Sequence, residues 1–415
     1  MDHLRRQIQP VPVEQYIQFL FRWQHLLPGR QETGPDGLQT CLAQLQGLSL
    51  PVEIWEREIL GRRVQGYTTS LLSHVTSTGS VVWAGSGPGK VRSVIRGEGN
   101  TFLHLQSMDV ETTIGEPAKR VLAYLRLHGA SFFSDIRTGT KLSLDATTNG
   151  IAELFWSGII TNDVLAELQA VRRPSRRDQE TLIERIEIVD PRHNPHRGRL
   201  MQRARRALRQ VPGWTGRWSL VHLPGVMGEP LSIEERARRQ ALQFLDRYGI
   251  VAREFCRRED LLPWPLIATE FQRMEMRGEI RKGYFVEGLS GMQYALPAAV
   301  EELQRARTST GSDAQPLLLN ACDPANPYGS GVDLPMRENS AGETGSGATA
   351  SGFARVPGNY LVFLHGVPVL FLANYGKRIW TLGETDVQII HEALRAFVDI
   401  DPAARASASV QRGDH

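Results

Sequence analysis

Residues 234–297 constrain the fold of this chain more than any other stretch of the sequence. Apolar residues keep helical spacing in the first part, and Gly249 follows as a stop. A second helix is expected over 265–277, where Gly278 ends it. Two strand-like runs follow, joined by a turn at 288–291. Helix, link, helix and hairpin is the order of a winged helix, whose second helix and basic wing are suited to lie along nucleic acid.

The same order recurs twice upstream. In three places a helix ends in a glycine and a β-run begins at once, as seen in HVTSTG-SVVW, ELFWSG-IIT and EMRG-EIRKGYF. The first of these runs leads into a hairpin with a Gly-Ser-Gly-Pro-Gly tip. A recurring unit of this kind predicts an array built on one plan. We therefore expect winged helices at 1–110, 115–172 and 233–307.

An arginine-rich stretch separates the second and third expected winged helices. Residues 172–217 contain thirteen arginines against five Asp or Glu. Arg203 and Arg206 lie in its helix-like part, and a guanidinium suits phosphate contact through its planar fork. A solvated linker explains such a charge run equally well. We assign 173–232 to a linker and leave its contact with DNA open.

After residue 307 the composition changes to short apolar β-type runs around a low-complexity segment, SAGETGSGATASG. We expect 308–402 to form a small β-barrel-like domain with a disordered loop at 338–352 and a final amphipathic helix. Residues 403–415 are expected to be a frayed tail. The fold class is therefore α+β, with tandem winged-helix units followed by a barrel-like domain and a C-terminal helix.

Composition argues against several classes of protein. No apolar run approaches the roughly 20 residues of a membrane span. The start of the chain lacks the apolar core of a signal peptide. Three scattered cysteines cannot form a disulfide framework or a CxxC metal site, which favours a reducing, cytoplasmic setting. The net charge of +3 is too small to indicate nucleic acid by itself.

The sequence shows no motif for a motor, a metal or a cofactor. The run GSGPGKV departs from the Walker A pattern at Ala84 and Val91, and it lies in a hairpin instead of preceding a helix. His193 and His196 have no partner cysteine, so we expect no metal site there. We expect no cofactor and no ATPase activity from this chain.

Two polar motifs remain. In residues 323–329, Asp-Pro-Ala-Asn-Pro-Tyr-Gly, the prolines, the Asp and the Asn indicate a rigid turn whose side chains bond the backbone. Gln44 and Gln46 flank Leu45 near a basic helix end, and two amides are able to hold a water or a base edge. Residues two apart do not share a helix face, which favours a solvated helix surface. Both interpretations of the glutamines stay open.

Long motifs of the chain resemble the C-terminal region of the large helicase-related (Lhr) proteins. In the family's order, they are FLFRWQHLLPG, GLQTCLAQLQGLSLPVEIWEREILGRRV, GSVVWAG, LFWSGIITND, LDRYGIVARE, GEIRKGYFVEGLSGMQYALP and DPANPYG. The family comprises DNA-repair helicases with an N-terminal 3′-to-5′ motor core, whose motifs do not occur in this sequence. The resemblance implies winged helices capped by a β-barrel, and a tetramer.

The same layout is similar to that of DNA glycosylases that unhook interstrand crosslinks. Those enzymes carry a Gln–apolar–Gln motif in their first winged helix, and Gln44 and Gln46 occupy a comparable place. Uracil-glycosylase activity with a catalytic Asp is also attributed to this region of the family. The resemblance therefore makes Gln44, Gln46, Asp399 and Asp401 the candidate catalytic residues.

We expect a DNA-binding and oligomerisation module of an Lhr-type repair helicase, without a motor of its own. The expected partners are single-stranded or damaged duplex DNA, a helicase motor core in cis or in trans, and further copies of the chain, with no membrane. The alternative is a DNA glycosylase that removes uracil or crosslinked bases, and a third reading is a purely architectural oligomerisation domain. The predicted DNA-binding residues are Arg273, Arg277, Arg281, Lys282, Arg203 and Arg206. Whether the chain is a piece of a longer helicase or stands alone is left open.

Overall fold

The computed structural model describes residues 9–103, 113–165, 168, 216–259, 261–308, 315–335, 353–383 and 387–400. Contacts along the chain divide the protein into two compact units. Unit 1 comprises Met1–Leu45, Ile54–Thr68 and Leu231–His415, and unit 2 comprises Gln46–Glu53 and Thr69–Pro230. The expected first winged helix, 1–110, therefore contributes segments to both units. None of the described helices is long and apolar enough to cross a membrane.

The N-terminal part of the chain is helical, as the apolar spacing predicts. Helix α2 (Val13–Trp23) buries one face, and α3 (Gly34–Leu45) follows it. Strands β1 (Glu32–Thr33) and β3 (Val64–Gln65) pair in parallel within unit 1. Three short helical segments lie between α3 and β3 in the sequence: the 3₁₀ turn η1 (Val52–Ile54), the π-helical η2 (Trp55–Leu60) and α4 (Gly61–Arg63).

The stretch 234–297 folds in the expected order, also within unit 1. Helix α15 (Ile233–Tyr248) starts at Ser232, whose hydroxyl accepts a hydrogen bond from the Glu235 amide at 3.1 Å, and it ends at Gly249 with φ 64°. The other elements are β9 (Ile250–Val251), α16 (Arg253–Arg258), α17 (Trp264–Met276), β10 (Arg281–Gly283), β11 (Gln293–Ala295) and α18 (Pro297–Thr308). The strands form a sheet of order β10-β11-β9. Strand β9 and helix α16 were not predicted, because two and six residues are too few to show a periodicity.

The buried side chain of Gln293 holds the wing of this winged helix in place. Its Oε1 accepts hydrogen bonds from the amides of Phe285 and Val286, both at 2.9 Å, and its Nε2 donates to the Val286 carbonyl at 2.8 Å. Val11 also pairs with Val286 as an isolated bridge. The wing backbone is thus fixed before any ligand binds.

Unit 2 contains the predicted Gly-rich hairpin. Helix α5 (Thr69–Ser77) leads into β4 (Val81–Gly85) and β5 (Lys90–Ile95), which pair antiparallel in a sheet of order β2-β5-β4 with β2 (Leu50–Pro51). Gly85 lies so close to the Phe155 carbonyl that an added Cβ would clash with it, and the Gly87 amide donates to the Trp156 carbonyl at 3.1 Å. Hairpin geometry and close approach therefore account for these glycines, in agreement with the departure of this run from the Walker A pattern.

The stretch expected to form the second winged helix also lies in unit 2. Its helices are α8 (Glu116–His128), α9 (Phe133–Thr140) and α10 (Leu144–Trp156), and its strands are β6 (Ser131–Phe132), β7 (Ile160–Asn162) and β8 (Arg217–Leu220). The sheet has the order β6-β8-β7. A short helix, α14 (Pro224–Met227), follows, and α6 (Gly99–Phe102) lies earlier in the chain.

Strand β8 corrects the expected extent of the linker. It lies inside 173–232, yet it pairs antiparallel with β7 from Ile160↔Leu220 to Asn162↔Trp218. The Arg217 amide also donates to Asp163 Oδ1 at 2.7 Å. The arginine-rich stretch therefore connects two paired strands of one sheet. Four residues carry too little pattern to reveal a strand, although Trp218 is fully buried.

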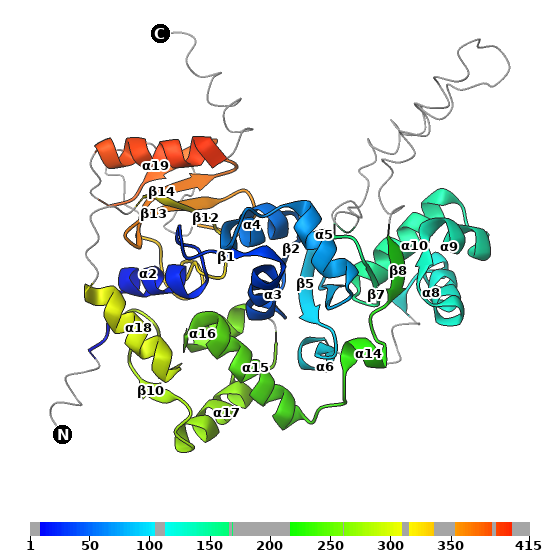
Figure 1. Cartoon of the computed structure of the whole chain (residues 1–415), viewed down its shortest axis with the longest axis horizontal. Coiled ribbons are helices and arrows are strands. Elements are labelled where there is room, and N and C mark those ends of the chain that lie inside the picture. The colour runs from blue at the N-terminus through cyan, green and yellow to red at the C-terminus, as the bar shows by residue number, and fades with distance from the viewer. Residues whose placement is uncertain are drawn as a thin grey trace, which may run out of the picture. The chain divides into compact units, whose positions relative to one another are not determined.

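The C-terminal part of unit 1 is an antiparallel sheet of order β12-β13-β14-β15, formed by β12 (Leu317–Asn320), β13 (Tyr360–Leu364), β14 (Val367–Ala373) and β15 (Arg378–Thr381). Helix α19 (Val387–Ile400) lies along one face of this sheet (Figure 1), where Phe397 joins a buried cluster with Tyr360 and Leu370. Among the described residues β12 and β15 do not pair, so the predicted barrel is not confirmed. The expected loop 338–352 and tail 403–415 lie outside the described residues.

The long apolar run around β13 and β14 belongs to the core. Leu361, Phe363 and Phe371 join the main cluster of unit 1, while Val362 and Leu370 face the cluster below α19. The expected oligomerisation would need apolar residues of this kind on the surface. Alternation buries most of them on the two faces of the sheet, and of this run only Val367 and Tyr375 are exposed large apolar residues among those the structure describes.

A buried ion pair links distant parts of unit 1. Arg63 Nη1 and Nη2 donate to the two carboxylate oxygens of Asp323 at 2.9 and 2.8 Å, and both side chains are fully buried. Asp323 Oδ1 also accepts from the Ala325 amide at 2.8 Å, and Asn326 Oδ1 accepts from the Tyr328 amide at 3.0 Å. The predicted rigid turn at 323–329 is thus confirmed.

Two further arginines hold the backbone of this turn. Arg355 donates to the carbonyls of Asp323, Asn326 and Tyr328. Arg258 donates to the carbonyls of Pro324 and Asn326 and to the Tyr248 hydroxyl. We call Arg63, Arg258 and Arg355, with the turn they hold, the arginine network. It joins α4, the third winged helix and the C-terminal sheet.

We expect the substitution Asp323→Asn to lower the free energy of unfolding by about 3–5 kcal/mol, because it leaves the buried Arg63 charge uncompensated. Arg305→Ala is the control, since it removes an exposed pair with Glu302, and such pairs contribute about 0–1 kcal/mol. Urea denaturation followed by circular dichroism measures both variants. Equal losses in the two variants would contradict a special role for the buried pair.

Candidate functional site

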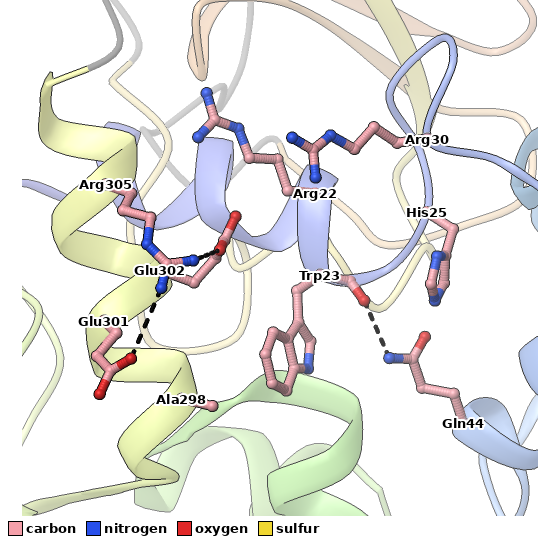
Figure 2. A pocket seen from close by; sticks show the side chains of 9 residues that line it. All are labelled: Arg22, Trp23, His25, Arg30, Gln44, Ala298, Glu301, Glu302 and Arg305. Atoms are coloured by element: carbon pink, nitrogen blue, oxygen red, sulfur yellow. Dashed lines mark hydrogen bonds and ion pairs between the residues drawn. The ribbon is translucent and has the colours of Figure 1, made fainter.

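A cavity of about 380 Å³ lies in unit 1, at the end of α2 and beside α3 and α18 (Figure 2). We call it the Trp23 pocket. Its lining residues are Arg22, Trp23, His25, Arg30, Gln44, Ala298, Glu301, Glu302 and Arg305. The volume falls in the range of about 300–1,000 Å³ that is usual for small-molecule sites.

The backbone at the end of α2 shapes one wall of this pocket. Helix α2 stops after Trp23, and His25 adopts a left-handed conformation with φ 58°. The Leu26 amide then donates to the Phe21 carbonyl at 2.8 Å, which reverses the chain. Histidine is one of the residues that tolerate this conformation. The reversal brings Trp23 and His25 to one cavity.

The charges of the Trp23 pocket are only partly balanced. Arg305 pairs with Glu302 at 3.0 Å and with Glu301 at 3.6 Å, and His25 Nδ1 lies 3.2 Å from Glu32 Oε1. Arg22 and Arg30 form no ion pair with any residue that the structure describes. The pocket therefore offers two guanidinium groups to an anionic ligand.

Gln44 contributes a buried amide of fixed orientation. The residue is 7% exposed, and its Nε2 donates to the carbonyls of Trp23 at 3.0 Å and Asp246 at 3.3 Å. If the amide were rotated by half a turn, its oxygen would face the oxygens of these two carbonyls, which cannot donate a hydrogen bond. The orientation with Nε2 toward the carbonyls, and Oε1 away from them, is therefore fixed. Within the described chain Oε1 is buried and accepts no hydrogen bond. Figure 2 shows this amide among the side chains around the cavity.

Gln46 is held by a different set of partners. It follows the end of α3, belongs to unit 2 and is 8% exposed. Its Nε2 donates to Glu98 Oε2 at 2.8 Å, and its Oε1 accepts from the Ile95 amide at 3.3 Å. The solvated-surface interpretation of the two glutamines is therefore wrong, because both side chains are buried. Gln44 keeps an acceptor without a partner, whereas both ends of Gln46 are engaged.

Sequence reasoning missed the residues that surround Gln44. Trp23 Nε1 donates to the Asp246 carbonyl at 2.7 Å, and Gln243 Nε2 donates to the Gln44 carbonyl at 2.7 Å. Desolvation by neighbouring protein raises the pKa of the Asp246 carboxyl, while the charges of Arg247 and His25 act to lower it. The polar sequence Arg-Trp-Gln-His at the end of α2 could have indicated a site. Nothing in the local sequence indicates that these residues contact α15.

The candidate acids at the C-terminus are not among the residues that line the Trp23 pocket. Asp399 lies in the last turn of α19, and Asp401 lies outside the described residues. The pocket residues are at α2, α3 and α18. The roles of Asp399 and Asp401 therefore stay predictions drawn from the family resemblance. No group of three metal-ligating side chains occurs in the part of the chain that the structure describes.

The predicted DNA-binding residues of the third winged helix differ in their surroundings. Arg273 pairs with Glu270, and Arg277 Nε lies 2.6 Å from Glu279 Oε1. That bond raises the pKa of Arg277 and lowers the pKa of Glu279. Arg281 and Lys282 are exposed on β10 and pair with no described acid. Arg203 and Arg206 lie outside the described residues.

The fold defines a protein of tandem winged helices, and comparisons show which proteins share it. The family description "Large helicase-related protein, winged-helix domain" matches residues 230–315 and 11–96. The chain is 29% identical over 427 residues to the Lhr helicase/uracil glycosylase of Escherichia coli, covering 95% of this chain. It is also 29% identical over 421 residues to the Lhr helicase/probable uracil glycosylase of Mycolicibacterium smegmatis, covering 97% of this chain.

These matches confirm the resemblance to the C-terminal part of the large helicase-related proteins. The chain spans about a quarter of the two curated relatives, 26% of each. The structure is also similar to the Streptomyces sahachiroi DNA glycosylase AlkZ, with a TM-score of 0.50, 13% sequence identity and coverage of 96% of this chain and 98% of that one. At this identity the likeness concerns the fold alone.

We expect the double substitution Arg281→Ala with Lys282→Ala to weaken DNA binding and to lower the salt slope by about two, because each phosphate contact contributes about one. The matched double variant Arg273→Ala with Arg277→Ala should change the slope less, since both arginines already pair with glutamates. Fluorescence anisotropy of a labelled duplex across a salt series measures both slopes. A larger change in the second variant would reverse this ranking.

Proposed function

We propose that this chain is a DNA-binding module of an Lhr-type repair protein and that it acts without a motor of its own. The observation that carries the proposal is the third winged helix, whose fixed wing presents Arg281 and Lys282 without acidic partners. Phosphate contacts from such a wing position a protein on DNA without reading its sequence. The names of the relatives, which join a helicase to a glycosylase, support this role.

The partner in this proposal is a helicase motor core, in cis or in trans. The support is that the chain spans only about a quarter of its curated relatives. A motor that moves along one strand needs a surface that holds the DNA on which it works. The winged helices are suited to this task because their contacts go mainly to the phosphate backbone.

A second candidate function is base removal, and Gln44 is the observation that favours it. Its Oε1 is a fixed acceptor with no partner among the described residues, in a pocket that Trp23 and two arginines also line. A base that leaves the duplex needs a face to stack on and a group that reads its edge. Trp23 would supply the face, and Gln44 would accept an N–H from the base. Arg22 and Arg30 would hold the flanking phosphates.

The reaction at such a pocket would be hydrolysis of the bond between base and sugar. Water forms a bond to the sugar C1′, while the C1′–N bond breaks and the base leaves with the electron pair and takes up a proton. A carboxylate assists by accepting the water proton or by stabilising positive charge on the sugar. Asp246, whose backbone carbonyl accepts hydrogen bonds from Trp23 and Gln44, carries a carboxyl group that is a further candidate in addition to Asp399 and Asp401.

Gel-shift and base-release assays on the purified chain test both functions. DNA binding with steep salt dependence but no base release supports the binding module and rejects the glycosylase. No binding at 50 mM salt would reject both, because specific and non-specific contacts are strongest at low salt.

If the chain releases uracil or a crosslinked base, we expect Gln44→Leu to slow release by about 5- to 150-fold, the equivalent of the 1–3 kcal/mol for a lost hydrogen bond to a buried group. DNA affinity should change little, because the amide does not touch phosphate. Gln46→Leu is the matched control, and its release rate should stay near that of the parent. Equal loss in both variants at unchanged thermal stability would contradict the assignment to Gln44.

A further inference from the structure

The turn between β14 and β15 holds a tyrosine in an unfavourable backbone conformation. Asn374, Tyr375 and Gly376 have φ values of 51°, 59° and 78° in succession. Asn and Gly tolerate this left-handed region, but a bulky aromatic residue rarely adopts it. Such strain persists only where the surroundings impose it, and it clusters at functional positions. Tyr375 nevertheless remains 51% exposed, so burial of its ring does not explain the strained conformation.

The surroundings of Tyr375 fix the turn. The Tyr375 amide donates to the Gly358 carbonyl at 2.7 Å, and the Asn374 amide donates to Asn359 Oδ1 at 3.1 Å. A Cβ added at Gly358 would lie 2.9 Å from the Tyr375 ring, and one added at Gly376 would lie 2.7 Å from the Phe397 ring of α19. The tyrosine ring therefore lies against Gly358 while about half of its surface stays open.

The charge beside this ring is positive. Lys377 and Arg378 follow directly, both are exposed, and neither pairs with a described acid. Residues 353–383 contain no Asp or Glu at all. Next to them Ile379 is exposed on β15, the edge strand of the sheet. An anion with an apolar planar part is the ligand that complements these groups.

We propose that Tyr375, Lys377 and Arg378 form a contact site for single-stranded DNA on the C-terminal sheet. A base stacks on the open face of Tyr375, and neighbouring phosphates pair with Lys377 and Arg378. Aromatic rings beside basic side chains bind single strands in this way because every base has a stacking face. A duplex keeps its bases stacked on each other, so the site selects unpaired nucleotides. The inference rests on the proposed DNA-binding function and adds a second surface to it, apart from the wing with Arg281 and Lys282.

The test uses the full chain with two labelled oligomers of equal length, one of oligo-dT and one of abasic sugar-phosphate. Anisotropy gives the affinity for each. Tyr375→Asn should weaken binding of oligo-dT by about 5- to 150-fold, the range for one lost stacked base, and should leave the abasic oligomer unaffected. Tyr375→Phe should bind both as the parent does. Lys377→Ala with Arg378→Ala should weaken both oligomers and lower the salt slope by about 1.4, two single-strand contacts at about 0.7 each.

Thermal unfolding separates this role from a structural one. Asn suits the left-handed conformation, so Tyr375→Asn should melt at or above the parent temperature while binding less oligo-dT. Parent-like affinity of Tyr375→Asn for oligo-dT would overturn the site. A parent chain that binds no DNA would remove the proposed function and this site together. If Arg281→Ala with Lys282→Ala loses affinity while the three sheet residues have no effect, only this inference fails. A change in oligomeric mass without a change in DNA affinity would assign the surface to copies of the chain and overturn it as well.

Discussion

The bidentate pair between Arg63 and Asp323 is the interaction on which the rest of unit 1 depends. The two residues are far apart in sequence, and each brings an otherwise separate piece of chain into one core. Taking two charges out of water costs several kcal/mol per ion, so the geometry must offset this cost. Gln24 also accepts from Arg63 Nη2 at 2.8 Å, and the Ile59 carbonyl accepts from Nη1 at 3.0 Å. These three partners together satisfy both terminal nitrogens of Arg63, whereas its buried Nε has no partner among the described residues.

The same network explains why the 323–329 turn is rigid without regular secondary structure. Arg258 and Arg355 donate to its carbonyls from two other elements. Burial and the nearby charge of Arg258 lower the pKa of the Arg355 guanidinium, and its three carbonyl acceptors favour the charged form. A turn held in this way connects the third winged helix to the C-terminal sheet through hydrogen bonds of buried side chains.

Local sequence patterns predicted the helices and hairpins, but not the elements that pack against them. Gly249 and Gly278 mark real helix ends, and the Gly-rich tip is a real hairpin, because such positions depend on backbone conformation alone. The burial of Gln44 depends on α15, about two hundred residues away, and no local signal contains that contact. Strand β8 was missed for a similar reason, since its partner β7 lies on the other side of a long arginine-rich stretch. The pocket could likewise not be predicted from the sequence, because residues of α2, α3 and α18 line it together.

The pairing of β7 with β8 has a consequence for how this protein changes over evolutionary time. The pairing of β7 with β8 fixes the two ends of the connection between Asn162 and Arg217, but it does not fix the length of that connection. Each doubling of such a connection costs only about 0.6 kcal/mol of closure free energy. Insertions and deletions there leave the sheet intact, so the number of arginines attached to the second winged helix is free to vary from one homologue to the next. A change in the length of this one insert then requires no change to any core residue.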